Sequence, residues 1–264
     1  MADIICGYAP TKGGQLHYRM TEQHHGRVPL LLLHQTASAS AMFTALMAEL
    51  ANDYWLIAPD TPGFGNSYQP NEPHSIKLYA NAIHEMCQTL NISQAFIFGH
   101  HTGAAIATQL ASVFPEFVQK LIMVGPPLLT DKQIAFLRER LLTNELDFDG
   151  RFLTDTWERL KKKSPDLPLD ILYRELVLTL QAGNSYPQAY TAVFAQPFAQ
   201  QLETINCPTL IIAGENDSLR ASLETTLARL KNGLMQIIPD AGTFICDTHP
   251  QQLADLIRPF LNTT

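Results

Sequence analysis

The sequence lacks long apolar runs and has little cysteine, and each of these features excludes some classes of protein. No apolar run approaches the length of about 18 residues that a membrane-spanning helix needs, so we expect no span and no membrane partner. The four cysteines lie far apart and form no Cys-x-x-Cys pair, which argues against a zinc site or a disulfide framework. The first ten residues lack a basic stretch followed by an apolar one, so we expect no signal peptide and a cytoplasmic protein.

Basic residues are also scarce. The chain has 18 Lys and Arg against 25 Asp and Glu, a net charge of −7, so nucleic acid is not an expected partner. The only basic run, at 161–163, is typical of a solvated helix end. The histidines follow no metal-ligand spacing, and we expect neither a metal nor a cofactor. The expected partner is a small-molecule substrate or ligand, and the sequence allows a homodimer.

What is present is an alternation of short apolar runs and helical patterns over 264 residues, enough for a full hydrophobic core. This alternation predicts an α/β protein with a mainly parallel twisted sheet flanked by helices. The predicted strands are 28–34, 54–59, 94–98, 118–124, 208–213 and 234–238, and the predicted helices between and after them are 42–50, 76–90, 102–114 and 250–261.

The rhythm changes between the strands at 118–124 and 208–213. No strand-like run appears there, and helical patterns follow one another near 131–142, 151–162, 168–182 and 186–196. We therefore predict a core made of residues 1–125 and 206–264, with 126–205 as an inserted helical cap over the carboxyl-terminal edge of the sheet. Ligand pockets commonly form between such an insertion and the sheet.

The most informative segment is Gly99-His100-His101-Thr102-Gly103, which follows a predicted strand and opens a predicted helix. Its two glycines have the spacing of the Gly-x-Ser-x-Gly nucleophile elbow. In such a turn the central residue adopts a strained backbone, and its neighbours must be very small so that strand and helix can approach each other. The sequence therefore predicts an elbow with His101 at its centre.

Other candidates also follow predicted strands. Gln35 stands where a backbone N–H completes an oxyanion hole, and Thr102 would supply the second N–H from a helix N-terminus. Asp217 ends the strand after the helical insertion, and Thr243 follows the last strand.

In this order of segments the chain resembles α/β-hydrolase-fold proteins with a helical cap, such as prolyl iminopeptidases, C–C bond hydrolases, epoxide hydrolases and haloalkane dehalogenases. The resemblance places His101 at the nucleophile position, Asp217 at the acid position and Thr243 at the histidine position. Neither a Ser-His-Asp mechanism nor one with a carboxylate nucleophile is available to these residues.

Several roles are open at this point. His101, Asp217 and Thr243 are the catalytic candidates, Gln35 and Thr102 the oxyanion-hole candidates. The candidates for substrate binding are His34, Thr36 and His100. The competing interpretations are that His34 only holds its loop, that His100 only packs, that Asp217 caps the next helix, and that Thr243 fills space.

Two functions of different classes fit this pattern. The first is an enzyme in which His101 acts as general acid or base on a small, largely apolar substrate, in hydrolysis or in lyase or isomerase chemistry. The second is a catalytically silent relative that binds a ligand or a partner; ordinary serine-type hydrolysis is a weaker third. For the enzyme, the His101 ring is expected to enter the volume left by Thr243 and to hydrogen-bond Asp217 directly, through Thr243 Oγ1 or through one water. The alternative is that the ring turns toward Gln35.

Overall fold

The computed structural model describes residues 3–23, 26–139 and 147–263, and its centre is a mainly parallel sheet, as predicted. The first two strands of the chain form an antiparallel hairpin. The second of them also pairs antiparallel with the strand at 56–59, and all other neighbouring strands are parallel. The sequence analysis assigned no strand to this hairpin. Across the sheet the order is β1 (Ile5–Pro10), β2 (Gln15–Met20), β4 (Leu56–Pro59), β3 (Leu30–Leu33), β5 (Ala95–His100), β6 (Val118–Val124), β7 (Thr209–Gly214) and β8 (Gly233–Ile238).

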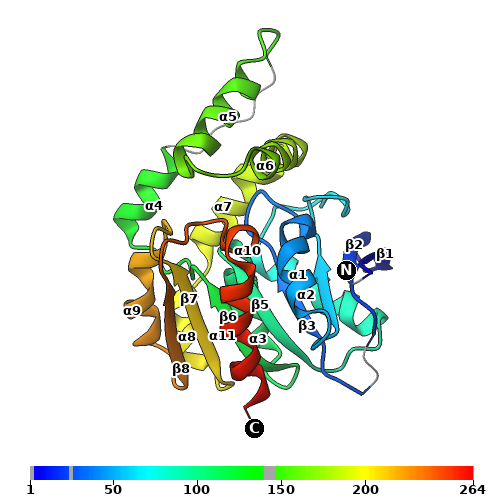
Figure 1. Cartoon of the computed structure of the whole chain (residues 1–264). Coiled ribbons are helices and arrows are strands. Elements are labelled where there is room, and N and C mark those ends of the chain that lie inside the picture. Colours follow the sequence, from blue (N-terminus) through cyan, green and yellow to red (C-terminus); the bar gives the residue numbers. More distant parts are fainter. Residues whose placement is uncertain (1–2, 24–25, 140–146, 264) are drawn as a thin grey trace.

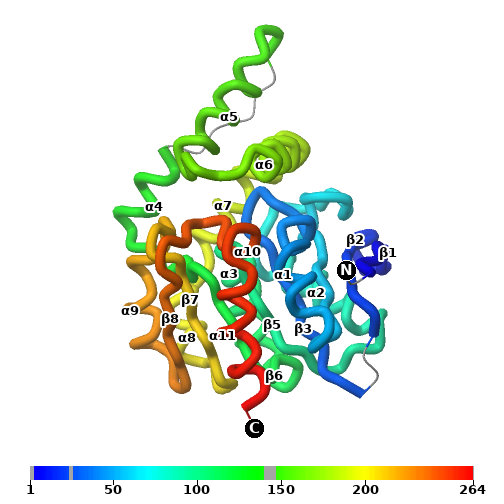
Figure 2. The backbone as a smooth tube through the Cα atoms, viewed as in Figure 1, coloured from blue at the N-terminus to red at the C-terminus, as the bar shows by residue number. Residues whose placement is uncertain are grey.

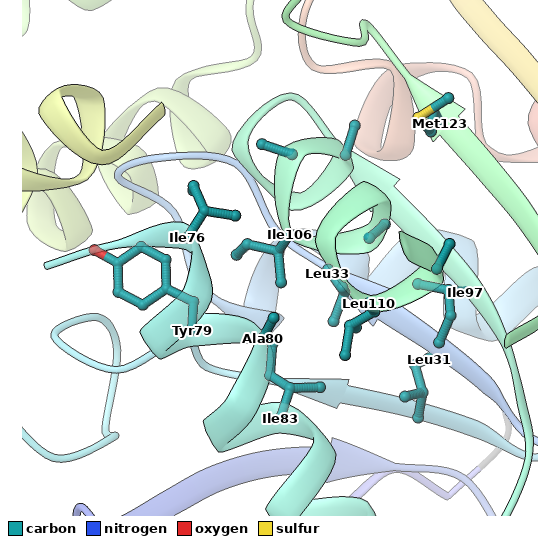
Figure 3. Packing of buried hydrophobic residues seen from close by; sticks show 14 of the residues in the cluster. Leu31, Leu33, Ile76, Tyr79, Ala80, Ile83, Ile97, Ile106, Leu110 and Met123 are labelled. Atoms are coloured by element: carbon teal, nitrogen blue, oxygen red, sulfur yellow. The ribbon is translucent and has the colours of Figure 1, made fainter. Parts of the chain in front are cut away.

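Helices cover both faces of this sheet (Figure 1). Strand β3 shows why its sequence is apolar throughout: Leu30 and Leu32 belong to one core cluster, Leu31 and Leu33 to the other. Figure 3 shows the second cluster, in which Ile76 and Ile83 of one helix lie near Ile106 and Leu110 of another. The helices on one face are η1 (Ser40–Phe43), α1 (Thr44–Leu50), α10 (Ile245–Thr248) and α11 (Pro250–Asn262). Those on the other face include α2 (Ile76–Thr89), α3 (Thr102–Val113) and α9 (Leu223–Leu227), which follows the short helix η2 (Arg220–Ser222).

The segment between β6 and β7 is helical, and its described residues contain no strand. In Figure 2 its first helices stand beyond one end of the sheet. They are α4 (Asp131–Arg138), α5 (Arg151–Lys163) and α6 (Leu169–Ala182). The next helix, α7 (Ser185–Ala195), contacts α2 and α3. The last part of the predicted helix 131–142 lies outside the described residues. A further helix that the sequence analysis missed, α8 (Phe198–Thr204), packs against α3, where Leu202 is fully buried. None of the helices in the described residues combines the length and hydropathy that crossing a bilayer requires.

The turn after β4 is held by one buried carboxylate, Asp60. Its Oδ2 lies 2.8 Å from His17 Nδ1 and accepts the Asn66 N–H at 2.9 Å, while Oδ1 accepts the Ser40 N–H at 2.7 Å. A Cβ on Gly65 would lie 2.2 Å from Asp60 Oδ2, so this carboxylate also explains the glycine. Asp60 therefore ties β2, the turn and the start of η1 to one another.

The elbow glycines are required by close backbone contact, and this gives a first prediction. A Cβ on Gly103 would lie 2.0 Å from the Leu33 carbonyl oxygen, and one on Gly99 would lie 2.3 Å from the Gly103 carbonyl oxygen. We expect Gly103→Ala to lower the free energy of unfolding by about 3 kcal/mol or more, because backbone cannot move aside as a flexible side chain can. The measurement is the urea midpoint of each purified protein.

Gly242→Ala is the matched control, because a Cβ there would meet nothing within 4 Å. We expect its urea midpoint to match that of the parent protein. If Gly103→Ala unfolds at the same urea concentration as Gly242→Ala, the close packing of α3 on β3 is not what requires the glycine. If Gly103→Ala does not fold at all, the prediction holds in its strong form.

Candidate active site

The structure places His101 at the centre of a strained turn between β5 and α3. Its backbone has φ 50° and ψ −108°, and its N–H donates to the Val124 carbonyl oxygen at 2.8 Å. A positive φ is unfavourable for a residue with a Cβ and is typical of functional turns. The predicted elbow is therefore present, with an imidazole where relatives of this pattern carry a nucleophile.

The His101 ring contacts Asp217 directly. Its Nε2 lies 2.9 Å from Oδ2 and 3.0 Å from Oδ1, and Asp217 also accepts the Leu219 N–H at 2.7 Å. The expected hydrogen bond between the two side chains is thus present. Asp217 is not the cap of the next helix, because η2 has Leu219 at its N-cap position and no side-chain cap, so the capping interpretation is wrong. Because a carboxylate accepts, Nε2 carries a proton, and in the neutral ring Nδ1 keeps the free lone pair.

Burial limits access to this pair without closing it. The His101 side chain is 11% exposed and that of Asp217 is 0% exposed. Burial alone would raise the pKa of the Asp217 carboxyl, but His101, with smaller help from His100 and the Leu219 N–H, holds that pKa below its usual value. Asp217 is therefore an anion at neutral pH, and it fixes the tautomer of His101.

Sequence analysis missed Gly125, the residue that makes room for the ring. It follows β6 with φ 56°, and a Cβ there would lie 2.4 Å from His101 Cδ2 and 2.5 Å from Nε2. The available signal was a glycine at the end of a strand that neighbours the elbow strand. Gly125 lets the His101 ring lie flat enough against the backbone to reach Asp217.

Thr243 does not take part in this contact. It is buried, with 3% exposure, and within the described residues it makes no hydrogen bond to His101 or Asp217. The alternative in which its hydroxyl bridges the two is therefore wrong, because the histidine reaches Asp217 without help. Among the described residues, Thr243 has no hydrogen bond that supports a catalytic role.

The loop after β3 is tied to the elbow by two threonine hydroxyls. Thr36 Oγ1 lies 2.9 Å from Thr102 Oγ1, which also accepts the Thr36 N–H at 3.4 Å. Among the described residues, no acceptor takes the backbone N–H of Gln35 or of Thr102. Two free donors beside the elbow are what an oxyanion hole requires, so the structure is compatible with this prediction.

Two of the three residues predicted to bind substrate, His34 and His100, are buried in the protein interior. His34 donates from Nδ1 to the Gln35 carbonyl oxygen at 2.9 Å and accepts the Thr61 N–H on Nε2 at 2.9 Å. Burial lowers its pKa, so the ring is neutral and holds its loop. His100 is 0% exposed and lines neither cavity described below; burial holds its pKa well below the usual value. Both rings are enclosed by protein, and their role in substrate binding stays a prediction.

Two cavities lie between the α4–α7 segment and the sheet, and Lys163 and Phe244 border both. The smaller, of about 60 Å³, contains the third predicted binding residue, Thr36, together with Gln35. The larger measures about 290 Å³. The other residues around the smaller one are Ala37, Arg159, Leu160, Glu175, Thr179, Tyr186 and Tyr190. Around the larger one are Ser164, Pro165, Asp166, Leu167, Asn216, Asp240, Gly242, Thr248 and His249. These linings are mixed and partly charged, so they do not match the expected preference for a largely apolar substrate.

Comparison with known proteins supports the fold. The sequence model of the α/β hydrolase fold matches residues 28–250, which is more than half of the chain. The chain belongs to the α/β-hydrolase family. An uncharacterised protein of Mycobacterium tuberculosis is 35% identical over 274 residues, covering 94% of this chain and 79% of that protein.

More distant members of the α/β-hydrolase family have named activities. The 2-(acetamidomethylene)succinate hydrolase of Mesorhizobium japonicum is 24% identical over 262 residues, covering 94% of this chain and 93% of its own length. A bromoperoxidase from Bacillus anthracis superposes with a TM-score of 0.83 at 19% identity, covering 98% of this chain and 100% of that one. At this identity the structural likeness shows the shared α/β-hydrolase fold.

One set of side chains in this α/β-hydrolase could hold a metal ion. Donor atoms of His100, His101 and Asp217 all lie within 4.8 Å of one another. A metal would have to replace the hydrogen bond between His101 Nε2 and Asp217. It would also lie near the Lys163 ammonium, which acts electrostatically on both His100 and Asp217. The positive charge opposes a divalent cation there.

Proposed function

We propose that this member of the α/β-hydrolase family is an enzyme in which His101 acts as general base and acid on a small-molecule substrate, without a covalent acyl-enzyme. The observation that carries the proposal is the contact of 2.9 Å between His101 Nε2 and Asp217 at the centre of the elbow. A histidine oriented by a carboxylate has one fixed basic nitrogen, which is the arrangement that general base catalysis needs.

The proposed reaction is hydrolysis of an acyl compound by activated water. Nδ1 of His101 takes a proton from water while the water oxygen bonds to the carbonyl carbon. The N–H groups of Gln35 and Thr102 stabilise the resulting oxyanion. When the intermediate collapses, the bond to the leaving group breaks and the leaving group receives the proton back from Nδ1. The named activities of family members such as the hydrolase from Mesorhizobium japonicum favour hydrolysis over lyase chemistry.

A prediction about serine chemistry separates this proposal from ordinary serine hydrolysis. Ser38 is fully buried and donates to Glu175 Oε1 at 3.0 Å, and Ser40 is 1% exposed. Within the described residues neither serine forms a hydrogen bond with a histidine, so neither is activated. We expect no covalent adduct after incubation with a fluorophosphonate, measured by intact-protein mass spectrometry, and little turnover of p-nitrophenyl esters. A stoichiometric adduct on Ser38 or Ser40 contradicts the proposal.

The test of the proposal itself is turnover of a panel of small esters, thioesters, lactones and amides by the parent protein and by His101→Gln. We expect the parent to turn over at least one compound and His101→Gln to lose that turnover, before and after treatment with EDTA. If compounds stabilise the parent against heat and none is converted, the silent, ligand-binding alternative is correct.

A further inference from the structure

Two cations of α5 face the smaller cavity without an anionic partner. Arg159 and Lys163 are four residues apart, so they project from the same side of the helix, and both border the cavity next to Gln35 and Thr36. In the part of the chain that the structure describes, neither forms an ion pair with a carboxylate. By contrast, Lys161 on the same helix pairs with Glu158 at 3.4 Å.

The Arg159 guanidinium is held in a fixed position. One of its nitrogens donates to Tyr186 Oη, and its Cζ lies 4.7 Å from the centre of the Tyr186 ring. A guanidinium that stacks on an aromatic face still presents its planar edge to a second acceptor. Lys163 Nζ lies 5.6 Å from the centre of the Phe244 ring, on the border that both cavities share.

The electrostatic surroundings also favour an anion between them. Arg159 and Lys163 act on each other as like charges, and Asp217 and Glu175 act on Lys163 only through space. Glu175, the carboxylate that would repel an anion in this cavity, is already engaged: its Oε1 accepts from Arg174 at 2.7 and 2.9 Å and from Ser38 at 3.0 Å. An anionic group bound by both cations would relieve their repulsion and form charge-assisted hydrogen bonds.

We propose that Arg159 and Lys163 bind a carboxylate of the substrate and so restrict this enzyme to acidic small molecules. The inference rests on the proposed function, because it names the substrate class of that same site. The cavity of about 60 Å³ has room for a small charged group, and the neighbouring cavity of about 290 Å³ takes the rest of the molecule past Lys163 and Phe244. The carboxylate then lies beside the loop that carries the Gln35 N–H.

The test is a binding measurement that needs no turnover. Isothermal titration calorimetry compares 4-phenylbutyrate with its neutral amide, which has nearly the same shape. We expect the parent protein to bind the carboxylate at least about tenfold more tightly, since a hydrogen bond to a charged group contributes at least that much. Arg159→Gln and Lys163→Gln should each lose most of this preference. Phenyl phosphate serves as a second anion, and its tighter binding would overturn the assignment to a carboxylate.

Lys162→Gln is the matched control, because it removes the same charge from an exposed neighbour that borders neither cavity. We expect it to keep the full preference. The inference is overturned if the parent binds acid and amide with equal affinity, or if it binds neither. It is also overturned if Lys162→Gln and Lys163→Gln lose the preference for the carboxylate equally. His101→Gln should bind the carboxylate as the parent does, so failure of the catalytic proposal and failure of this one give different results.

Discussion

Replacing His101 by glutamine is expected to lower turnover of the substrate found in the panel by about 10²- to 10⁴-fold, the usual contribution of a general acid–base group. Glutamine can still donate a hydrogen bond to Asp217, so the elbow should keep its shape. An amide, however, cannot accept a proton from water at neutral pH and therefore cannot act as the base. His101→Ala should lose as much turnover. Asp217→Asn should also lose a large part of it, because the amide no longer fixes which nitrogen of His101 carries the proton.

The measurement is kcat/KM for each variant, together with its thermal unfolding temperature. His84→Gln is the control, since it removes a histidine from α2, where the ring stacks on Phe114 outside both cavities. We expect it to keep the parent's turnover. If His101→Gln folds as the parent does and retains its kcat/KM, the reaction does not use His101, and the catalytic proposal fails.

The second large effect concerns stability. We expect Asp60→Ala to lower the free energy of unfolding by about 3 kcal/mol or more, because His17 and the N–H groups of Ser40 and Asn66 all lose their acceptor, and each buried group left unsatisfied costs about 1–3 kcal/mol. The exposed Asp155→Ala on α5 is the control and should change stability by less than about 0.5 kcal/mol. Urea unfolding at pH 7 measures both.

The same carboxylate makes a specific prediction about acid. Burial opposes its ionisation, but the hydrogen bond from His17 and those from the Asn66 and Ser40 N–H groups lower the pKa of Asp60 from 3.8 to about 2. A carboxyl with a lowered pKa stabilises the folded state above its unfolded pKa, and this stabilisation disappears as the pH falls from about 4 to about 2. It amounts to about 2 kcal/mol. We expect Asp60→Ala to lack this part of the acid dependence; an unchanged slope would show that other groups cause it.

The sequence predicted those parts of the site that depend on local geometry. The two elbow glycines have a fixed spacing because strand and helix must touch there, and Asp217 stands at the end of a strand whose neighbours are set by the sheet. Contact between His101 and Asp217 followed from the length of the imidazole and the small size of Thr243. The N-terminal hairpin was missed because its strands, half-buried at the edge of the sheet, lack the continuous apolar run of β3.

The lining of the cavities could not be predicted in this way. The basic run at 161–163 was interpreted as a solvated helix end, and all three lysines are exposed, but this interpretation did not show that Lys163 also borders both cavities. Which lysine faces the sheet depends on the rotation of α5 about its own axis, and that rotation is set by packing between distant segments. The burial of His34 and His100 was not foreseen for a related reason, since their place beside the elbow did not show how completely other residues enclose them.

The absence of a side chain at Gly125 makes two positions of this chain dependent on each other. A serine at the elbow would not reach the space above Gly125, whereas the imidazole passes within 2.5 Å of where a Cβ would stand. Gly125→Ala should therefore be more harmful with His101 present than in a His101→Ser background. In a redesign of this elbow, His101 and Gly125 therefore have to be changed together. A scaffold that receives a histidine at its elbow also needs a glycine at the position of Gly125.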